Sequence, residues 1–139
     1  MKKIILITAL ILLSVACDQN QRVANKLAGE WNVTSYTVNT TNAGSLYLNL
    51  NEIKLVYNFD NCEIAEGNDC SLLTIINENS TNAQTIIEKR YTIEGDGYIL
   101  KILTNSIEQK FIIKSISSKY LELESLNNAN ETNIAMAKK

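Results

Sequence analysis

Apolar and polar side chains alternate along most of the chain at a period of two, the pattern of a β-strand with one buried face. The pattern is clearest on either side of Gly95-Asp96-Gly97. The residues that share one face there are Ile87, Lys89, Tyr91, Ile93, Tyr98, Leu100 and Ile102. Glycine adopts the positive backbone angles that tight turns need, so the two segments predict a β-hairpin.

The same pattern predicts eight strands joined by short connections. They are Glu30–Asn39, Ser45–Leu50, Ile53–Asp60, Ser71–Asn77, Gln84–Glu94, Gly97–Thr104, Glu108–Ile116 and Lys119–Glu124. Asn51-Glu52 is short enough to join the second and third strands as a hairpin turn. We expect an all-β fold, either an antiparallel up-and-down barrel or a β-sandwich. Closure as a barrel removes exposed sheet edges, which a chain without proline must otherwise protect.

The two ends of the chain lack this alternation. Residues 18–25 are polar, and we expect residues 17–25 to form a flexible tether before a domain that spans residues 26–126. Residues 127–139 contain only Ile134 and Met136 as large apolar side chains, which predicts a frayed polar tail.

The first sixteen residues have the features of an export signal. Lys2 and Lys3 precede an apolar run over residues 4–13, which is too short to span a bilayer as a helix. Small residues follow in Ser14-Val15-Ala16, where a signal peptidase would cut. We therefore expect residues 1–16 to be removed and the chain to be exported, which permits disulfide bonds.

Ser14-Val15-Ala16-Cys17 resembles the bacterial lipobox, with serine in place of the commonest residue, leucine, at its first position. The resemblance implies that the Cys17 thiol carries a lipid and anchors the chain in the bacterial cell envelope, most simply at the outer membrane, facing either the periplasm or the outside. Acylation would also remove the odd thiol among three cysteines. The alternative is a soluble secreted protein that begins with a free Cys17.

Cys62 and Cys70 are close enough in sequence to form a local disulfide, the expected state in an exported protein. Acidic residues around them raise the alternative of a divalent-cation site. They are Asp60, Glu63, Glu66 and Asp69. Their spacing does not match a twelve-residue calcium loop, so we expect no metal site and no cofactor.

Composition argues against two functional classes. The chain has 13 Lys+Arg against 15 Asp+Glu, which leaves no basic surface for nucleic acid. It has no histidine, the commonest general base, so no Ser-His or Cys-His arrangement can form. Glu122 and Glu124 alternate with Leu121 and Leu123, which places these carboxylates on the solvated outer face of a strand. We expect a protein that is not an enzyme.

The most specific pattern is Leu27-Ala28-Gly29-Glu30-Trp31 at the start of the first predicted strand. Its Gly-x-Trp resembles the opening of the first strand in lipocalins. Together with the aromatic strand ending at Cys62, the partner Cys70 and the closing strand at residues 120–123, it resembles small lipocalin-like lipoproteins of Bacteroidetes. The resemblance covers residues 26–126 and implies an eight-stranded lipocalin-like barrel on a lipid anchor.

Two functions follow from a barrel of this kind. The first is binding of a small apolar or amphipathic molecule by a monomeric, membrane-anchored barrel. The predicted wall or floor residues are Trp31, Tyr57, Phe59, Tyr91, Tyr98 and Phe111. The second is a filled barrel without a cavity that presents its loops to a protein partner, because small eight-stranded barrels can be packed with side chains.

Overall fold

The predicted alternation produces strands along almost the whole chain. The structure is a computed structural model, and it describes residues 18–40, 44–64, 68–126 and 130–139. Its elements are α2 (Gln19–Leu27), β1 (Gly29–Thr40), β2 (Gly44–Tyr47), β3 (Ile53–Phe59), β4 (Cys70–Glu78), β5 (Gln84–Glu94), β6 (Ile99–Thr104), β7 (Ile107–Ile116), β8 (Tyr120–Ser125) and β9 (Asn130–Lys138).

Eight of these strands form a closed barrel. Sequential neighbours from β3 to β9 pair antiparallel, and β1 pairs with β3 on one side and with β9 on the other. Trp31, for example, lies opposite Tyr57 on β3 and opposite Lys138 on β9. The prediction of an antiparallel up-and-down eight-stranded barrel is confirmed, and the β-sandwich alternative is wrong.

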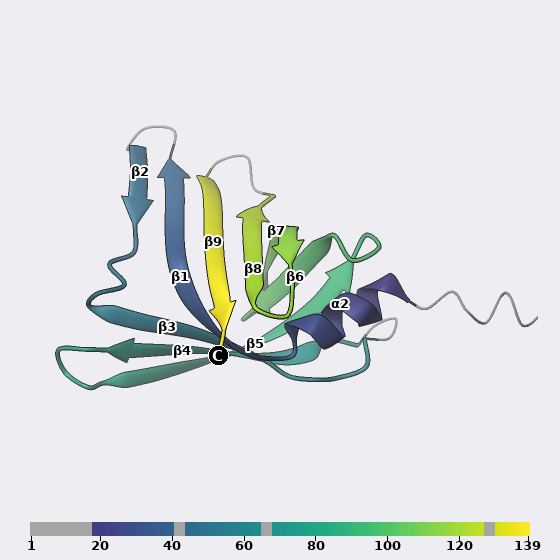
Figure 1. Ribbon diagram of the computed structural model, residues 1–139, viewed down its shortest axis with the longest axis horizontal. Helices are drawn as coiled ribbons and strands as arrows, with labels where there is room; N and C mark the ends of the chain where they lie inside the picture. The colour runs from purple at the N-terminus through teal and green to yellow at the C-terminus, as the bar shows by residue number, and fades with distance from the viewer. Residues whose placement is uncertain (1–17, 41–43, 65–67, 127–129) are drawn as a thin grey trace, which may run out of the picture.

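The second predicted strand is not part of the barrel wall. β2 pairs with the far end of β1, where Thr37–Thr40 lie opposite Gly44–Tyr47, so the predicted hairpin through Asn51-Glu52 is wrong. The physical reason is the divergence of β1 and β3, which pair only between Gly29–Asn32 and Val56–Phe59. Beyond that point the two strands run apart (Figure 1), and β2 pairs with the edge that β1 leaves open.

The eighth strand of the barrel is β9, which replaces the predicted frayed tail. Ile134 and Met136 point into the core and are 3% and 0% exposed. β9 pairs along both β8 and β1, so it closes a sheet whose two edges would otherwise be free. The tail prediction is therefore wrong over residues 130–138, and residues 127–129 lie outside the described residues.

The predicted flexible tether is wrong as well, because residues 19–27 form α2. The Asp18 carboxylate caps the helix by accepting a hydrogen bond from the Asn20 amide at 2.9 Å. Ala24 and Leu27 are buried, and the helix lies against one end of the barrel (Figure 1). The Gly97 amide donates to Asn20 Oδ1 at 2.8 Å, which ties α2 to the β5–β6 turn. Cys17 lies outside the described residues.

We call the end of the barrel covered by α2 the closed end, and the opposite end the open end. A register shift in β1 between Val33 and Ser35 changes which side chains face inward. Trp31 and Val33 face the core near the closed end. After the shift, Tyr36 lies opposite the inward-facing Ile134 and so faces the interior toward the open end.

Candidate functional site

Trp31 fills the floor of the barrel at the closed end. Its side chain is fully buried, and its Nε1 donates to the Leu27 carbonyl oxygen at 2.6 Å. Lys138 Nζ lies 5.1 Å from the Trp31 ring centroid and donates to the Lys26 carbonyl oxygen. The first strand, the last strand and α2 therefore meet at this one indole ring.

Aromatic rings continue the packed region above the floor. The Phe59 and Tyr91 rings meet edge to face with centroids 5.1 Å apart, and Tyr57 stacks on Phe59 at 6.2 Å. The Tyr91 hydroxyl donates to the Asp60 carbonyl oxygen at 2.7 Å. Burial, with a smaller effect of Asp60, raises the pKa of Tyr91 to about 12, so this phenol stays neutral. Phe59 and Tyr91 thus fill the interior, as Trp31 does.

Tyr98 does not belong to this interior set. Its side chain is 68% exposed, so its predicted place in the wall or floor of the barrel is wrong. Strict alternation with Leu100 and Ile102 would point Tyr98 inward. However, the turn between β5 and β6 uses positive φ angles at Gly95, Asp96 and Gly97, and Tyr98 is its last residue. The alternation of inward and outward side chains in β6 therefore begins only at Ile99, after Tyr98.

A pocket of about 450 Å³ opens between β1, β7, β8 and β9 at the open end. Of the six predicted ligand residues, only Phe111 lines it. The lining residues are Tyr36, Val38, Glu108, Gln109, Lys110, Phe111, Ser125, Leu126, Asn130 and Thr132. Its volume lies within the range of about 300–1,000 Å³ typical of small-molecule sites. We call it the open-end pocket.

The segment that follows β2 covers the gap where β1 and β3 diverge. Leu48 and Leu50 pack against the barrel core, and the Leu48 amide donates to the Tyr36 carbonyl oxygen at 3.1 Å. A second pocket, of about 370 Å³, lies between this segment and β1, and Tyr36 lines it too. Tyr36 therefore stands in the wall of both pockets.

Four polar side chains face the interior from β1, β3, β4 and β5, and we call them the interior polar group. They are Tyr36, Tyr57, Thr74 and Lys89. Thr74 lies opposite both Tyr57 and Ile87 in the sheet and is 3% exposed. Lys89 lies opposite the fully buried Leu72, and its Nζ is 5.8 Å from the centroid of the Tyr57 ring.

Burial controls the protonation of this group. It raises the pKa of Tyr36, and it raises that of Tyr57 strongly, with a further contribution from the nearby Tyr36. It lowers the pKa of Lys89, because a low-dielectric interior disfavours the ammonium. Both phenols are therefore neutral hydrogen-bond donors at neutral pH.

Comparison with solved structures places this geometry among known folds. Bovine odorant binding protein in complex with a selenium-containing odorant matches 84% of this chain and 72% of its own, with a TM-score of 0.52 and 16% identity. A deswapped triple mutant of bovine odorant binding protein matches 82% of this chain and 74% of its own, with a TM-score of 0.51 and 15% identity. The chain has a lipocalin-like fold. No family model and no curated protein matches the sequence.

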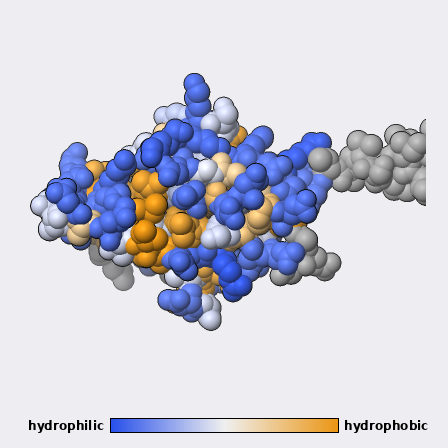
Figure 2. All heavy atoms as spheres, turned by 90° about the horizontal axis from the view of Figure 1, so that it is seen from below, coloured by the Kyte–Doolittle hydropathy of each residue, from blue (hydrophilic) through white to orange (hydrophobic). Residues whose placement is uncertain are grey.

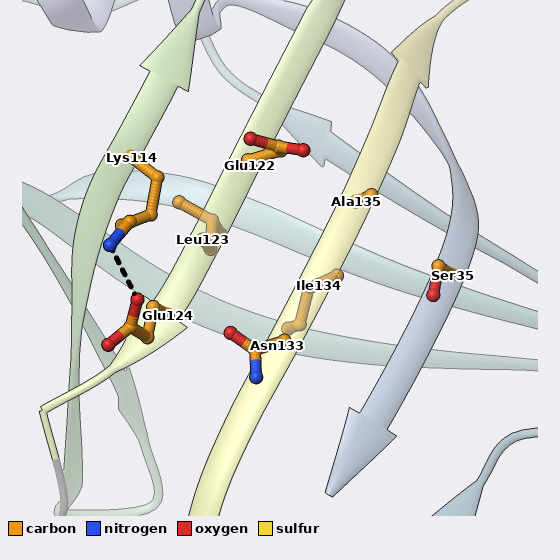
Figure 3. A pocket seen from close by; sticks show the side chains of 8 residues that line it. All are labelled: Ser35, Lys114, Glu122, Leu123, Glu124, Asn133, Ile134 and Ala135. Atoms are coloured by element: carbon orange, nitrogen blue, oxygen red, sulfur yellow. Dashed lines mark ion pairs between the residues drawn. The ribbon is translucent and has the colours of Figure 1, made fainter.

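The outer surface of the lipocalin-like barrel carries a shallow pocket of about 280 Å³ over β8 and β9 (Figure 3). Lys114 Nζ lies 2.9 Å from a Glu124 carboxylate oxygen, and the Ser115 hydroxyl donates to Glu122. Glu122 and Glu124 therefore lie on the outer face, as their alternation with leucines predicts, and contact polar neighbours there.

An apolar patch lies on the underside of the lipocalin-like barrel (Figure 2). Across β3, β4 and β5, the outward-facing Val56, Ile75 and Ile86 lie directly opposite one another; Ile86 is 54% exposed and Ile75 is half-buried, whereas Val56 is buried. On β1, Asn32 lies opposite Val56, and its buried Oδ1 has no hydrogen-bond partner among the described residues. The alternation pattern treats all outward positions as solvated, so it does not predict this patch.

Cys62 and Cys70 form the predicted disulfide, with Cα atoms 5.9 Å apart. Gln21 on α2 bonds the loop, donating to the Cys62 carbonyl oxygen and accepting from the Ile64 amide. An Asp69 carboxylate oxygen lies 3.7 Å from a guanidinium nitrogen of Arg90. In the described part of the chain no cluster of acidic residues, cysteines or histidines has the geometry of a metal site; Glu66 lies outside that part.

Sequence reasoning missed most of the open-end pocket and the interior polar group. The sequence does indicate the inward direction of Lys89, because Lys89 alternates onto the same face of β5 as Ile87, Tyr91 and Ile93. A charged side chain on an otherwise apolar face predicts either a buried ion pair or a ligand contact. Tyr36 had no such signal, since its inward direction depends on the register shift in β1.

Proposed function

We propose that this protein binds a small apolar or amphipathic molecule through the open end of its barrel. The observation that carries the proposal is the open-end pocket of about 450 Å³, where Tyr36, Val38 and Phe111 provide an apolar wall. The comparison with bovine odorant binding protein, solved in complex with an odorant, supports binding of a small molecule by this fold.

The closed end is not expected to hold the ligand. Trp31, Phe59 and Tyr91 are at most 1% exposed and in contact with one another or with α2. Eight-stranded barrels are wide enough to be filled by side chains or to hold one small ligand. This barrel combines both, with a filled lower half and a pocket above it.

The test is a fluorescence titration of the chain beginning at Asp18 with N-phenyl-1-naphthylamine, an uncharged apolar dye. We expect saturable binding that 1-decanol displaces. Phe111→Asp, which places a charge in the open-end pocket, should weaken dye binding by at least about tenfold. Phe111→Leu is the control, because it keeps an apolar side chain there. No saturable dye binding by the native sequence would overturn the proposal.

A second function is favoured by the apolar patch on the outer face, where the exposed Ile86 lies opposite the half-buried Ile75. Exposed apolar patches of this kind mark contact surfaces for proteins. The same titration separates the two functions, since a barrel that binds no apolar dye leaves the patch and the loops as its means of recognition.

We further propose that Cys17 is lipidated and that the protein is held, as a monomer, in the bacterial cell envelope. No helix in the described part of the chain has the length and apolar character to cross a bilayer. Because Asp18 already caps α2, a lipid on Cys17 would be separated from the folded barrel by almost no chain. The closed end would then face the membrane, and the open end would face away.

Cell fractionation of the full chain and of Cys17→Ala tests the anchor. We expect the native protein in the membrane fraction with acyl mass at its N-terminus, and the variant in the soluble fraction. Recovery of the native protein unmodified and soluble would contradict the proposal. One acyl chain alone gives only marginal membrane binding, so stable retention in the membrane also requires more than one acyl group on the protein.

A further inference from the structure

We propose that the barrel selects amphipathic anions, with the Lys89 ammonium pairing with the carboxylate of the ligand beside Tyr57 and Thr74. The inference rests on the proposed function and deepens it by naming the chemical class of the ligand. Its support is the arrangement of the interior polar group on β1, β3, β4 and β5.

The first support is the direction of Lys89. It lies opposite Leu72, which is fully buried, and it shares a face of β5 with the buried Tyr91. Its neighbours Glu88 and Arg90 are exposed on the other face. Lys89 is therefore the only charged residue among the inward-facing residues of β5, and its Nζ lies over the Tyr57 ring.

The second support is that no side chain of the described residues neutralises this charge. Lys101, Lys110, Lys114 and Lys139 each have a carboxylate oxygen within 4.0 Å, and Lys89 has none. Burial lowers the pKa of the Lys89 ammonium, because desolvation disfavours its charged form. A bound anion would offset that cost, because an opposite charge nearby favours the ammonium.

The third support is a buried hydroxyl beside Lys89 and Tyr57. Thr74 Oγ1 is fully buried and makes no hydrogen bond with any described residue. The Tyr57 and Tyr36 side chains face the interior on the neighbouring β3 and β1 and supply two further hydroxyls. A buried polar group without a partner is costly and rare in native proteins. Three neutral hydroxyls and one ammonium can all donate, so the group that satisfies them is rich in acceptor oxygens.

The fourth support is the connection to the open-end pocket. Tyr36 lines that pocket and is close enough to Tyr57 to raise its pKa. An apolar tail beside Phe111 and Val38 could therefore extend into the pocket while its head group reaches the interior polar group. The ligand class that fits both parts is an amphipathic carboxylate.

The experiment measures displacement of N-phenyl-1-naphthylamine from the chain beginning at Asp18 by decanoate and by 1-decanol, which differ in their head group. We expect the native sequence to bind decanoate about tenfold more tightly than 1-decanol. Lys89→Met, which keeps most of the aliphatic stem of the side chain without its charge, should remove this preference, once each affinity is corrected for the variant's own affinity for the dye. Lys54→Met is the matched control, since Lys54 is exposed on the outer face of β3.

Thr74→Val gives a second readout that does not depend on Lys89. It removes the hydroxyl without a partner and keeps the shape of the side chain, so the empty protein should be at least as stable while decanoate binding weakens about threefold. Equal affinity for decanoate and 1-decanol, or a preference that survives Lys89→Met, would overturn the inference and leave the proposed function standing. Failure of the native sequence to bind the dye would overturn both.

Discussion

Deleting residues 130–139 is expected to abolish cooperative unfolding of the barrel. The deletion removes β9, which pairs with β8 along one edge and with β1 along the other. It also removes Ile134 and Met136 from the core, and burial of such side chains contributes about 2–5 kcal/mol each. With two open sheet edges added, the loss is comparable with the whole stability of about 5–15 kcal/mol of a small domain.

Urea unfolding followed by near-UV circular dichroism measures this effect. Deletion of Lys139 alone is the control, because it keeps the whole of β9 and removes one exposed ion pair with Glu30. Exposed ion pairs contribute at most about 1 kcal/mol, so this variant should unfold much like the native sequence. A cooperative transition at the native midpoint after deletion of residues 130–139 would contradict the role of β9 as the closing strand.

Trp31→Ala is expected to lower the free energy of unfolding by about 3–5 kcal/mol. The substitution empties the floor of the barrel and removes both the hydrogen bond to the Leu27 carbonyl oxygen and the contact with Lys138. Trp31→Phe keeps an aromatic ring but loses the donor, so it should cost less, about 1–3 kcal/mol from the unpaired carbonyl.

The matched control for Trp31→Ala is Tyr98→Ala. Tyr98 is also aromatic and was predicted from the sequence to share the interior, but its side chain is 68% exposed. Its truncation should change the free energy of unfolding by less than about 0.5 kcal/mol. Far-UV circular dichroism in urea compares all the variants without relying on tryptophan fluorescence. Similar losses for Trp31→Ala and Tyr98→Ala would contradict the assignment of Trp31 as the floor residue.

Alternation predicted most of the barrel strands because the interior is apolar and the surface is polar over nearly all of their length. It failed for β9, whose inward row contains Ile134 and Met136 but also Thr132 and Asn130. The sequence around these two apolar residues resembles that of a loop. What makes it a strand is long-range pairing, because β1 and β8 offer it two edges that no local pattern reveals.

The helix α2 was missed because polar residues dominate its sequence. Its signals were the cap at Asp18 and the apolar spacing of Val23, Ala24 and Leu27, which places one narrow stripe against the barrel. Such a short helix is not stable alone, and contacts with the barrel stabilise it: the Gly97 amide donates to Asn20 Oδ1, and Gln21 Nε2 donates to the Cys62 carbonyl oxygen.

The candidate site could be predicted only in part. The aromatic residues Trp31, Tyr57, Phe59, Tyr91 and Phe111 are buried as predicted, since large apolar rings on the inner face of strands have nowhere else to go. Which of these rings line a pocket depends on which end of the barrel is packed with side chains. That end is determined by the divergence of β1 and β3 and by the position of α2. Neither is visible in a local pattern.

Closure of the barrel by β9 also determines how the chain must fold. The contact between Trp31 and Lys138 joins the first strand of the barrel to β9, more than a hundred residues along the chain. Contacts so distant in sequence are slow to form, because a loop of almost the whole chain must close before they do. The barrel therefore cannot close before β9 forms, and until then β1 and β8 each keep an unpaired edge that can pair with another chain.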